Sequence, residues 1–201
     1  RLWEVDLYIN LEAILISLSC YFVGSIPFGL LLSKFFNKSD PRLIGSKNIG
    51  ATNIVRTSGW KLGLLTLIFD MLKGLIPVVI LKNHSVEQSF IILFIFLGHL
   101  FPIWIKFKGG KGIAVIIGCL LGYNFFYGLI FSLVWLVTAV VSKYSSLSAL
   151  VASLSILIIV YLENDNIFLM VLLMVTMIFL KHIANIRRLL KGNELRINLK
   201  K

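Results

Sequence analysis

Long runs of apolar residues alternate with short polar segments along most of the chain. The runs are Ile14–Leu32, Leu62–Leu81, Ser89–Ile105, Gly112–Val141, Tyr144–Leu162 and Asn166–Leu180. Only the second carries formal charges, Asp70 and Lys73. Because about 20 apolar residues in a helix cross the hydrocarbon core of a bilayer, the pattern predicts an all-α, polytopic membrane protein. Gly24 and Pro27 lie inside the first run and predict a kink there.

The uncharged run Gly112–Val141 decides the number of spans. As one helix it gives six spans, whereas a break near Gly122–Asn124 gives seven. With seven spans and an outside N-terminus, 17 of the 20 lysines and arginines fall on the cytoplasmic side, while six spans divide them almost evenly. We therefore predict seven spans with a cytoplasmic C-terminus. Gly112–Gly122 reaches only about 16 Å at ~1.5 Å per residue, so we expect a half-span that neighbouring helices shield.

Composition agrees with a membrane protein. Hydrophobic residues make up 58 % of the chain, against about 45–50 % in soluble domains. A net charge of +11 would suggest nucleic acid in a soluble protein, but here the basic residues lie between apolar runs, so we expect no nucleic acid partner. Cys20 and Cys119 match no disulfide or metal spacing and are expected to be buried. Arg1–Glu12 is polar and acidic, so no cleavable signal peptide is expected.

Lys106–Gly112 is the most unusual of the polar segments between the apolar runs. It reads KFKGGKG and holds three lysines and three glycines in seven residues. Glycines let a backbone present its N–H groups to a ligand, and the lysines add positive charge. The combination predicts an anion site, with phosphate as the favoured anion. It is not a Walker A loop, because no Ser or Thr follows Lys111. The alternative is a basic connector that only sets membrane topology.

A second polar segment lies on the same predicted face. Gly45–Arg56 reads GSKNIGATNIVR and is dense in short hydrogen-bonding side chains. Arg56 offers a planar fork that can grip phosphate at two points. Such residues also suit an ordinary solvated loop. The segment is therefore a second candidate for binding an anion, and its candidate ligands are Ser46, Asn48, Thr52, Asn53 and Arg56.

A third segment, Lys181–Glu194, reads KHIANIRRLLKGNE. On a helix His182 and Asn185 share a face, which Arg188 continues, and Gly192 predicts the helix end. This face could hold a polyol phosphate. The alternative is a basic segment that binds anionic lipid, which we favour for Arg187, Lys191, Lys200 and Lys201.

Three further polar features lie close to these segments. Asp70 and Lys73 stand three residues apart within a span, which predicts a buried ion pair because charges inside a membrane are usually paired or functional. His99 lies about two helical turns before the glycine-rich loop and could face the site or pack against neighbouring helices. The short turn Lys143–Ser146 could complete a polar pocket.

The chain resembles the bacterial PlsY family of acyl-phosphate:glycerol-3-phosphate acyltransferases. The similarity runs in order from about residue 20 to residue 194 and rests on SIPFG at Ser25–Gly29, GSKNIGATNIVR, GHLFPIWIKFKGGKGIA and HIANIRRLLKGNE. Two positions depart from the family pattern. Lys47 stands where the family usually has glycine, and Val115 stands where threonine is common.

The resemblance implies a single domain, 1–201, that transfers a fatty acyl group from acyl phosphate to the 1-hydroxyl of glycerol 3-phosphate. The products are 1-acyl-glycerol 3-phosphate and phosphate, and the reaction is the first committed step of phospholipid synthesis. No cofactor or metal is implied. The donor is already activated, so no covalent intermediate is needed, which agrees with the lack of a Ser-His-Asp or HxxxxD pattern. The implied setting is a monomer in the bacterial inner membrane with a cytoplasmic active site, partnered by the soluble enzyme that makes acyl phosphate.

The resemblance also implies roles for individual residues. The implied catalytic residues are Ser46, Arg56, Lys111 and His182. The implied donor-binding residues are Ser46, Asn48, Thr52, Asn53, Arg56, Lys106, Gly109, Gly110 and Lys111, and the implied acceptor-binding residues are Ser146, Lys181, His182 and Asn185. The proton of the attacking hydroxyl can go to His182 or to a phosphate oxygen of the substrate.

Two other functions fit the sequence less well. A transporter or flippase for a phosphorylated solute or lipid would need polar residues spread through the spans, where only Asp70 and Lys73 are charged. A non-catalytic scaffold would not need three polar, glycine-containing segments on one face.

Overall fold

The computed structural model describes residues 2–197, with side chains from residue 11 onward, and the regular secondary structure in this part of the chain is all helical. Lys200 and Lys201, predicted above to meet anionic lipid, lie outside the described residues. The helices are α1 (Leu2–Gly24), α2 (Phe28–Phe35), α3 (Ala51–Ser58), α4 (Trp60–Ile80), α5 (Gln88–Leu100), the 3-10 helix η1 (Ile103–Ile105), α6 (Ile113–Tyr123), α7 (Phe125–Ser142), α8 (Ser145–Leu162), α9 (Phe168–Lys181) and α10 (Ile183–Leu190).

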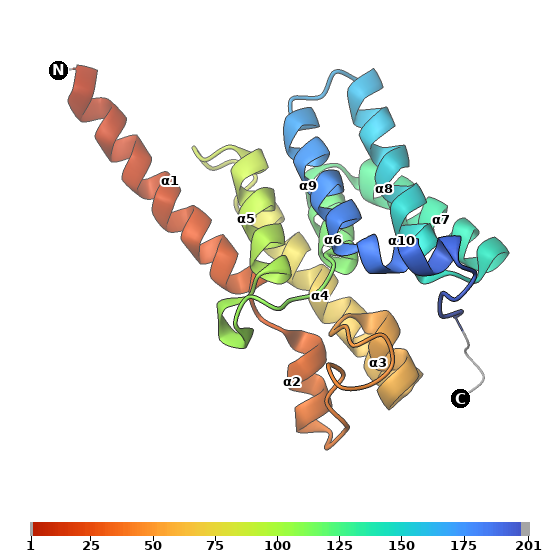
Figure 1. Cartoon of the computed structure of the whole chain (residues 1–201). Helices are drawn as coiled ribbons and strands as arrows, with labels where there is room; N and C mark the ends of the chain where they lie inside the picture. Colours follow the sequence, from red (N-terminus) through yellow and green to blue (C-terminus); the bar gives the residue numbers. More distant parts are fainter. Residues whose placement is uncertain (1, 198–201) are drawn as a thin grey trace.

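The predicted kink in the first apolar run is confirmed. Helix α1 ends at Gly24, and α2 begins after Pro27, which cannot donate a backbone hydrogen bond. The two helices are bent by 41° relative to each other. As Figure 1 shows, α2 therefore leaves the line of the long α1 and lies beside α3 at the lower end of the molecule.

The predicted break in the thirty-residue run is also confirmed. Helix α6 ends at Tyr123, and Asn124 caps α7 by accepting a hydrogen bond from the Phe126 N–H at 2.9 Å. Helix α6 has only 11 residues. It packs against α4, α5 and α7, and Ile116, Cys119 and Leu120 are almost wholly buried. The short helix is thus shielded by its neighbours, as expected of a half-span.

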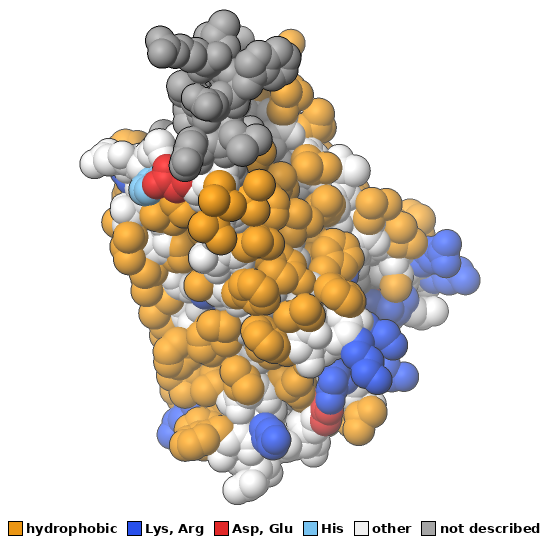
Figure 2. Space-filling view, turned by 90° about the vertical axis from the view of Figure 1, so that its left-hand side faces the viewer, with side chains coloured by type: hydrophobic (Ala, Val, Ile, Leu, Met, Phe, Trp, Pro, Cys, Tyr) orange, Lys and Arg blue, Asp and Glu red, His pale blue; other side chains and the backbone are white. Residues whose placement is uncertain are grey.

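Four helical segments are long and apolar enough to cross a membrane, and the number rises to six if each bent pair is one span. The bent pairs are α1 with α2 and α9 with α10. The apolar helices carry exposed hydrophobic side chains, as on α1 at Ile14, Leu15 and Phe22. Figure 2 shows one such face, which is largely hydrophobic, with lysine and arginine gathered toward its lower end and lower right. The fold is therefore that of an integral membrane protein, while the seventh span and the orientation stay predictions.

Two parts of the polar segments differ from the sequence-based expectation. Gly45–Arg56 is not a plain loop, because its second half forms α3, which buries Ile54 and packs on α4. This packing overrides the weak helix propensity of the Asn, Thr and Val residues. The third segment is not one continuous helix. His182 stands at a bend of 58° between α9 and α10, and α10 lies across the end of the bundle beside α8.

The polar and sulfur-containing side chains within the apolar runs are accommodated as expected. Lys73 Nζ lies 2.8 Å from Asp70 Oδ1 and donates a 2.7 Å hydrogen bond to the carbonyl oxygen of Ile26. Both side chains are buried, so the predicted buried ion pair is confirmed. Cys20 and Cys119 are buried free thiols.

Candidate active site

The three polar segments meet around one cavity of about 570 Å³. Helix α3 and the turn before it supply one wall, Lys111 and Gly112 supply a second, and the start of α8 with α10 supplies a third. Predicted site residues that line the cavity are Ser46, Asn48, Thr52, Asn53, Arg56, Lys111, Ser146, His182 and Asn185. Segments more than 120 residues apart in sequence (Arg56 and Asn185, for example) therefore contribute to a single polar site.

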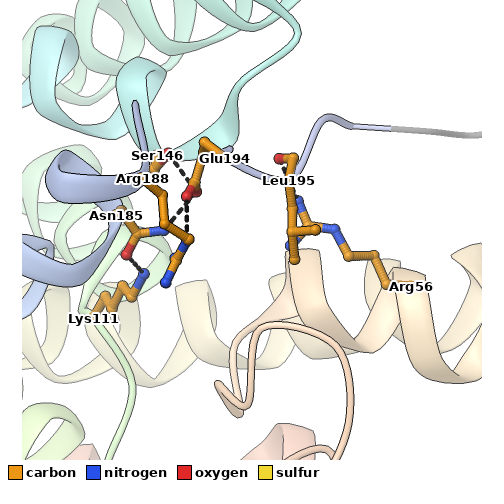
Figure 3. Close-up of polar contacts among 7 residues, drawn as sticks. All are labelled: Arg56, Lys111, Ser146, Asn185, Arg188, Glu194 and Leu195. Carbon is orange, nitrogen blue, oxygen red and sulfur yellow. Dashed lines mark hydrogen bonds and ion pairs between the residues drawn. The ribbon is translucent and has the colours of Figure 1, made fainter. Parts of the chain in front are cut away.

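Lys111 stands at the centre of this polar site. It leaves the glycine-rich loop one residue before the left-handed Gly112 that starts α6, and its ammonium donates a hydrogen bond to Asn185 Oδ1. Figure 3 shows this contact together with the groups around it. Burial lowers the pKa of Lys111 to about 8, with Glu194 opposing the shift and Arg188 and Arg56 adding to it. Lys111 is thus a partly desolvated cation, placed to meet an anion.

Glu194 is the site residue that sequence reasoning missed. Its Oε1 accepts hydrogen bonds from Asn185 Nδ2 at 2.6 Å and Ser146 Oγ at 2.8 Å, and its Oε2 accepts from Arg188 Nε at 2.7 Å. Burial raises the pKa of Glu194, but the hydrogen bonds from Asn185, Ser146 and Arg188 outweigh it, and the net pKa is lowered. The carboxylate holds α8 and α10 together at the site (Figure 3). A signal was present, because Glu194 is the only acid after Asp165.

The residues after α10 run along one side of the cavity, and we call Glu194–Ile197 the C-terminal strap. Arg56 Nη2 donates to the Leu195 carbonyl oxygen at 3.1 Å, as Figure 3 shows. The Ile197 N–H donates to the Lys143 carbonyl oxygen at 2.7 Å. Glu194 and Ile197 both line the cavity. The strap therefore joins α3 to the connection before α8, so residues beyond the third segment also contribute to the site.

Asn53 organises the turn before α3. Its Nδ2 donates to three carbonyl oxygens, and its Oδ1 accepts from the Ser46 N–H at 2.8 Å. The side chain is only 2 % exposed. Because this amide is fully used within the turn, the structure assigns it to holding the loop, which places Ser46. Asn48 differs: it lines the cavity, but its Oδ1 is buried and has no hydrogen-bond partner in the described part of the chain.

His182 is 2 % exposed and has a defined tautomer. Its Nδ1 lies 2.8 Å from the Ile178 carbonyl oxygen, which can only accept, so Nδ1 carries the proton. The lone pair of Nε2 is then free to accept a proton. Ser146, the predicted site residue on α8, already donates its hydroxyl hydrogen bond to Glu194. Thr52 Oγ1 lies 3.0 Å from Ser145 Oγ, which ties α3 to α8.

Four predicted residues do not line the cavity. Lys106 is exposed and has a left-handed backbone conformation after η1. Lys181 turns toward the end of α5, where its Nζ donates to the Leu100 carbonyl oxygen at 2.9 Å and lies 4.2 Å from the Phe101 ring centroid. Gly109 and Gly110 pack against the end of α5 at His99 and do not line the cavity. The sequence predicts these four residues at the site only because they lie close in the chain to Lys111 or His182, and sequence does not show which way each side chain points.

The cavity continues from its polar end into an apolar branch between α4, α6 and α7. Its lining residues there are mostly aliphatic or aromatic: Leu64, Leu67 and Met71 from α4, Ile113 and Ile117 from α6, and Trp135 and Leu136 from α7. Such a shape suits an amphiphile with an anionic head and an apolar tail. Among the side chains that the structure describes, residues 11–197, no three His, Cys, Asp or Glu are grouped so that they could hold a metal ion.

Comparisons with known proteins agree with this chemistry. A chain named glycerol-3-phosphate acyltransferase from Pelagibacter ubique is 47 % identical over 186 residues, covering 92 % of this chain and 97 % of the relative. One of the same name from Bartonella quintana is 47 % identical over 190 residues, covering 90 % of each chain.

Two crystal structures are similar in fold, both of PlsY, an integral membrane glycerol 3-phosphate acyltransferase. The glycerol 3-phosphate form gives a TM-score of 0.88 at 34 % identity, covering 93 % of this chain and 96 % of that one. The lysophosphatidic acid form gives 0.85 at 33 % identity, covering 94 % and 96 %. The model of the glycerol-3-phosphate acyltransferase family matches residues 14–192. With its helical membrane fold and its polar site at the mouth of an apolar branch, the chain belongs to the glycerol-3-phosphate acyltransferase family.

Proposed function

We propose that this enzyme transfers a fatty acyl group from acyl phosphate to the 1-hydroxyl of glycerol 3-phosphate. The observation that carries the proposal is the continuity of one cavity from a cationic end at Lys111 and Arg56 to an apolar branch beside Met71 and Trp135. The acyl chain of the donor lies in the apolar branch, and its phosphate lies at the cationic end. The products, 1-acyl-glycerol 3-phosphate and phosphate, begin phospholipid synthesis.

Within the polar end, the two substrates are divided between its walls. Lys111, Arg56 and Ser46 meet the donor phosphate, and Asn48 lines the same wall of the cavity. His182 and Asn185, with Ser146 behind them, receive glycerol 3-phosphate. The hydroxyl oxygen attacks the acyl carbon, the new ester bond forms, and the bond between the acyl carbon and the phosphate oxygen breaks. Charge that grows on the leaving phosphate is stabilised by the Lys111 ammonium.

The attacking hydroxyl loses its proton to one of two groups. The first is His182, whose Nε2 lone pair is free because Nδ1 donates to Ile178. The second is a phosphate oxygen of the substrate. The substitution His182→Ala distinguishes the two groups. If His182 takes the proton, its loss lowers kcat. If a phosphate oxygen takes the proton and His182 only binds the acceptor, its loss raises KM for glycerol 3-phosphate.

The membrane arrangement belongs to the same proposal. The segments rich in Lys and Arg lie in the lower half of Figure 1 or near its middle, at α10, while the start of α1 and the connection between α8 and α9 lie at the top. The positive-inside rule then favours a cytoplasmic active site and an outside N-terminus. Counting α6 as a half-span gives seven spans. We further propose a monomer in the bacterial inner membrane that receives acyl phosphate from a soluble enzyme.

The test is to supply the purified protein in detergent micelles with glycerol 3-phosphate and one of two donors, acyl phosphate or acyl-CoA. We expect lysophosphatidic acid and stoichiometric phosphate with acyl phosphate. The matched control is Lys111→Ala, which should insert and fold but make little product. Product from acyl-CoA alone would refute the donor assignment while leaving the acceptor assignment intact.

A further inference from the structure

His99 lies at the end of α5, directly beneath the glycine-rich loop, and is 5 % exposed. Its backbone carbonyl oxygen accepts a hydrogen bond from the Gly110 N–H at 3.1 Å, and the neighbouring Leu100 carbonyl oxygen accepts from Gly109 at 3.3 Å. The imidazole ring fills the space beside Gly110. A Cβ atom placed on Gly110 would lie 2.2 Å from His99 Nε2, well inside van der Waals contact. The loop therefore rests on this ring.

The opposite edge of the ring faces the buried ion pair. His99 Nδ1 lies 3.8 Å from Asp70 Oδ1, and Asp70 is held by Lys73, whose Nζ also binds the carbonyl oxygen of Ile26. This places one polar connection between the kink after α1, helix α4 and the end of α5. His99 and Asp70 also line the cavity that contains Lys111. The pair and the ring are thus placed to support the loop from below.

We propose that His99 is a positioning residue. Its imidazole ring packs against Gly110, fixes the position of Gly109–Lys111 and so determines where the Lys111 ammonium lies. The Asp70–Lys73 pair holds the ring in this position. No proton is passed through His99 in this role. The inference rests on the proposed donor-phosphate role of Lys111, and it gives His99 a function that a packed histidine lacks.

The two glycines of the loop provide a steric test with a built-in control. Neither Gly109 nor Gly110 has a positive φ, so the backbone of each accepts alanine and only space is limiting. A Cβ on Gly110 would meet the His99 ring, whereas one on Gly109 would lie 2.1 Å from the His99 carbonyl oxygen and 2.4 Å from Pro102 Cδ. Shortening the His99 side chain therefore makes room at Gly110 and none at Gly109.

The experiment compares Gly110→Ala and Gly109→Ala, each with and without His99→Ala, by kcat/KM for acyl phosphate and by thermal unfolding. We expect Gly110→Ala to lower kcat/KM by roughly 10²-fold in the wild type, the scale of a 1 Å misplacement of a catalytic group. In the His99→Ala background the same change should lower kcat/KM by less than about threefold. The difference between the two effects measures the coupling of His99 with Gly110, and it is of the size that adjacent residues show. The cost of Gly109→Ala should be the same in both backgrounds.

Further measurements separate positioning from a purely structural role. If His99→Ala does not fold, His99→Asn replaces it in the experiment. Asn keeps a polar group toward Asp70 but lacks the ring, so it should also reduce the loss of kcat/KM caused by Gly110→Ala. Relief seen only in the unfolding temperature, without relief in kcat/KM of the folded protein, would overturn the proposal. So would a Gly110→Ala variant as active as the wild type. Failure of the wild type to use acyl phosphate would instead refute the proposed function, and the two failures are therefore distinguishable.

Discussion

The lowered pKa of Lys111 predicts how substrate affinity depends on pH. Burial brings this pKa to about 8, so the free enzyme loses the ammonium charge as the pH rises through that value. The phosphate groups of the substrates have a second pKa near 6 and stay doubly charged over this range. We therefore expect KM for acyl phosphate to be lowest below pH 8 and to rise above it.

The size of the effect follows from the same pKa. At pH 9, about one unit above it, roughly a tenth of the molecules retain the charge, which corresponds to ~1.4 kcal/mol and a tenfold rise in KM. Unfolding does not explain such a rise. Between about pH 8 and the usual lysine pKa near 10.4, the unfolded chain holds the proton that the folded chain has lost, so this group makes the folded state more stable as the pH increases.

The measurement is initial rates from pH 7 to 9.5 for the wild type and for Lys111→Arg, whose guanidinium keeps its charge throughout. The wild type should show the rise, and Lys111→Arg should show a flat KM even if its kcat is reduced. A wild-type KM that stays constant to pH 9.5, or an equal rise in both proteins, would show that Lys111 is not the cation that binds the donor.

Three further predictions concern the residues around Lys111. Glu194→Gln should raise KM for glycerol 3-phosphate by about tenfold. A charge-assisted hydrogen bond contributes ~1.5–3 kcal/mol, and the partial exposure of Arg188 places the bond between Arg188 and Glu194 at the low end of this range. Steady-state kinetics checks this prediction, with Glu194→Asp as the control. Lys47→Gly should keep full activity and raise the unfolding temperature, because Lys47 is exposed with φ +59°, a conformation that costs a non-glycine residue ~1 kcal/mol or more. Arg56→Ala should raise KM for acyl phosphate more than KM for glycerol 3-phosphate, and Asn185→Ala the reverse, in a two-substrate kinetic matrix.

Each of these has a clear contrary result. An unchanged KM in Glu194→Gln would mean that Asn185 and Ser146 are held without the carboxylate charge. A fall in activity of more than about tenfold in Lys47→Gly, ~1.4 kcal/mol, would place Lys47 in the site. Equal increases of both KM values in Arg56→Ala and in Asn185→Ala would show one shared anion pocket in place of two.

The sequence predicted the helical membrane fold well because hydrophobicity and charge act locally. The break near Gly122–Asn124 is an example: the distribution of lysine and arginine favoured it, and in the structure Asn124 caps α7 there. The structure also brings Arg56, Lys111, His182 and Asn185 to one cavity, as the grouping of polar segments on one face suggested. The reason is that topology alone decides which connections lie at the same end of a bundle.

The sequence could not predict features that depend on contacts between distant segments. Helix α3 forms because Ile54 is buried against other helices, although its own residues favour helix weakly. Glu194 looks like one acid in a basic tail until α8 and α10 are brought together around it. Lys181 and Lys106 were grouped with the site because the bend at His182 and the left-handed turn after η1, which direct them elsewhere, have no reliable local signal.

The contacts of Asn185 bear on how the two substrates influence each other. Asn185 accepts from Lys111 and donates to Glu194, so it joins the proposed donor cation to the proposed acceptor wall. A donor phosphate that draws the Lys111 ammonium toward itself must weaken the bond to Asn185 Oδ1, which then becomes free to accept from a hydroxyl of glycerol 3-phosphate. Thermodynamic linkage requires the reverse effect to be equal. We therefore expect each substrate to lower the dissociation constant of the other, and loss of that mutual effect in Asn185→Ala, measured by equilibrium binding with a non-hydrolysable donor analogue, would identify this amide as the link.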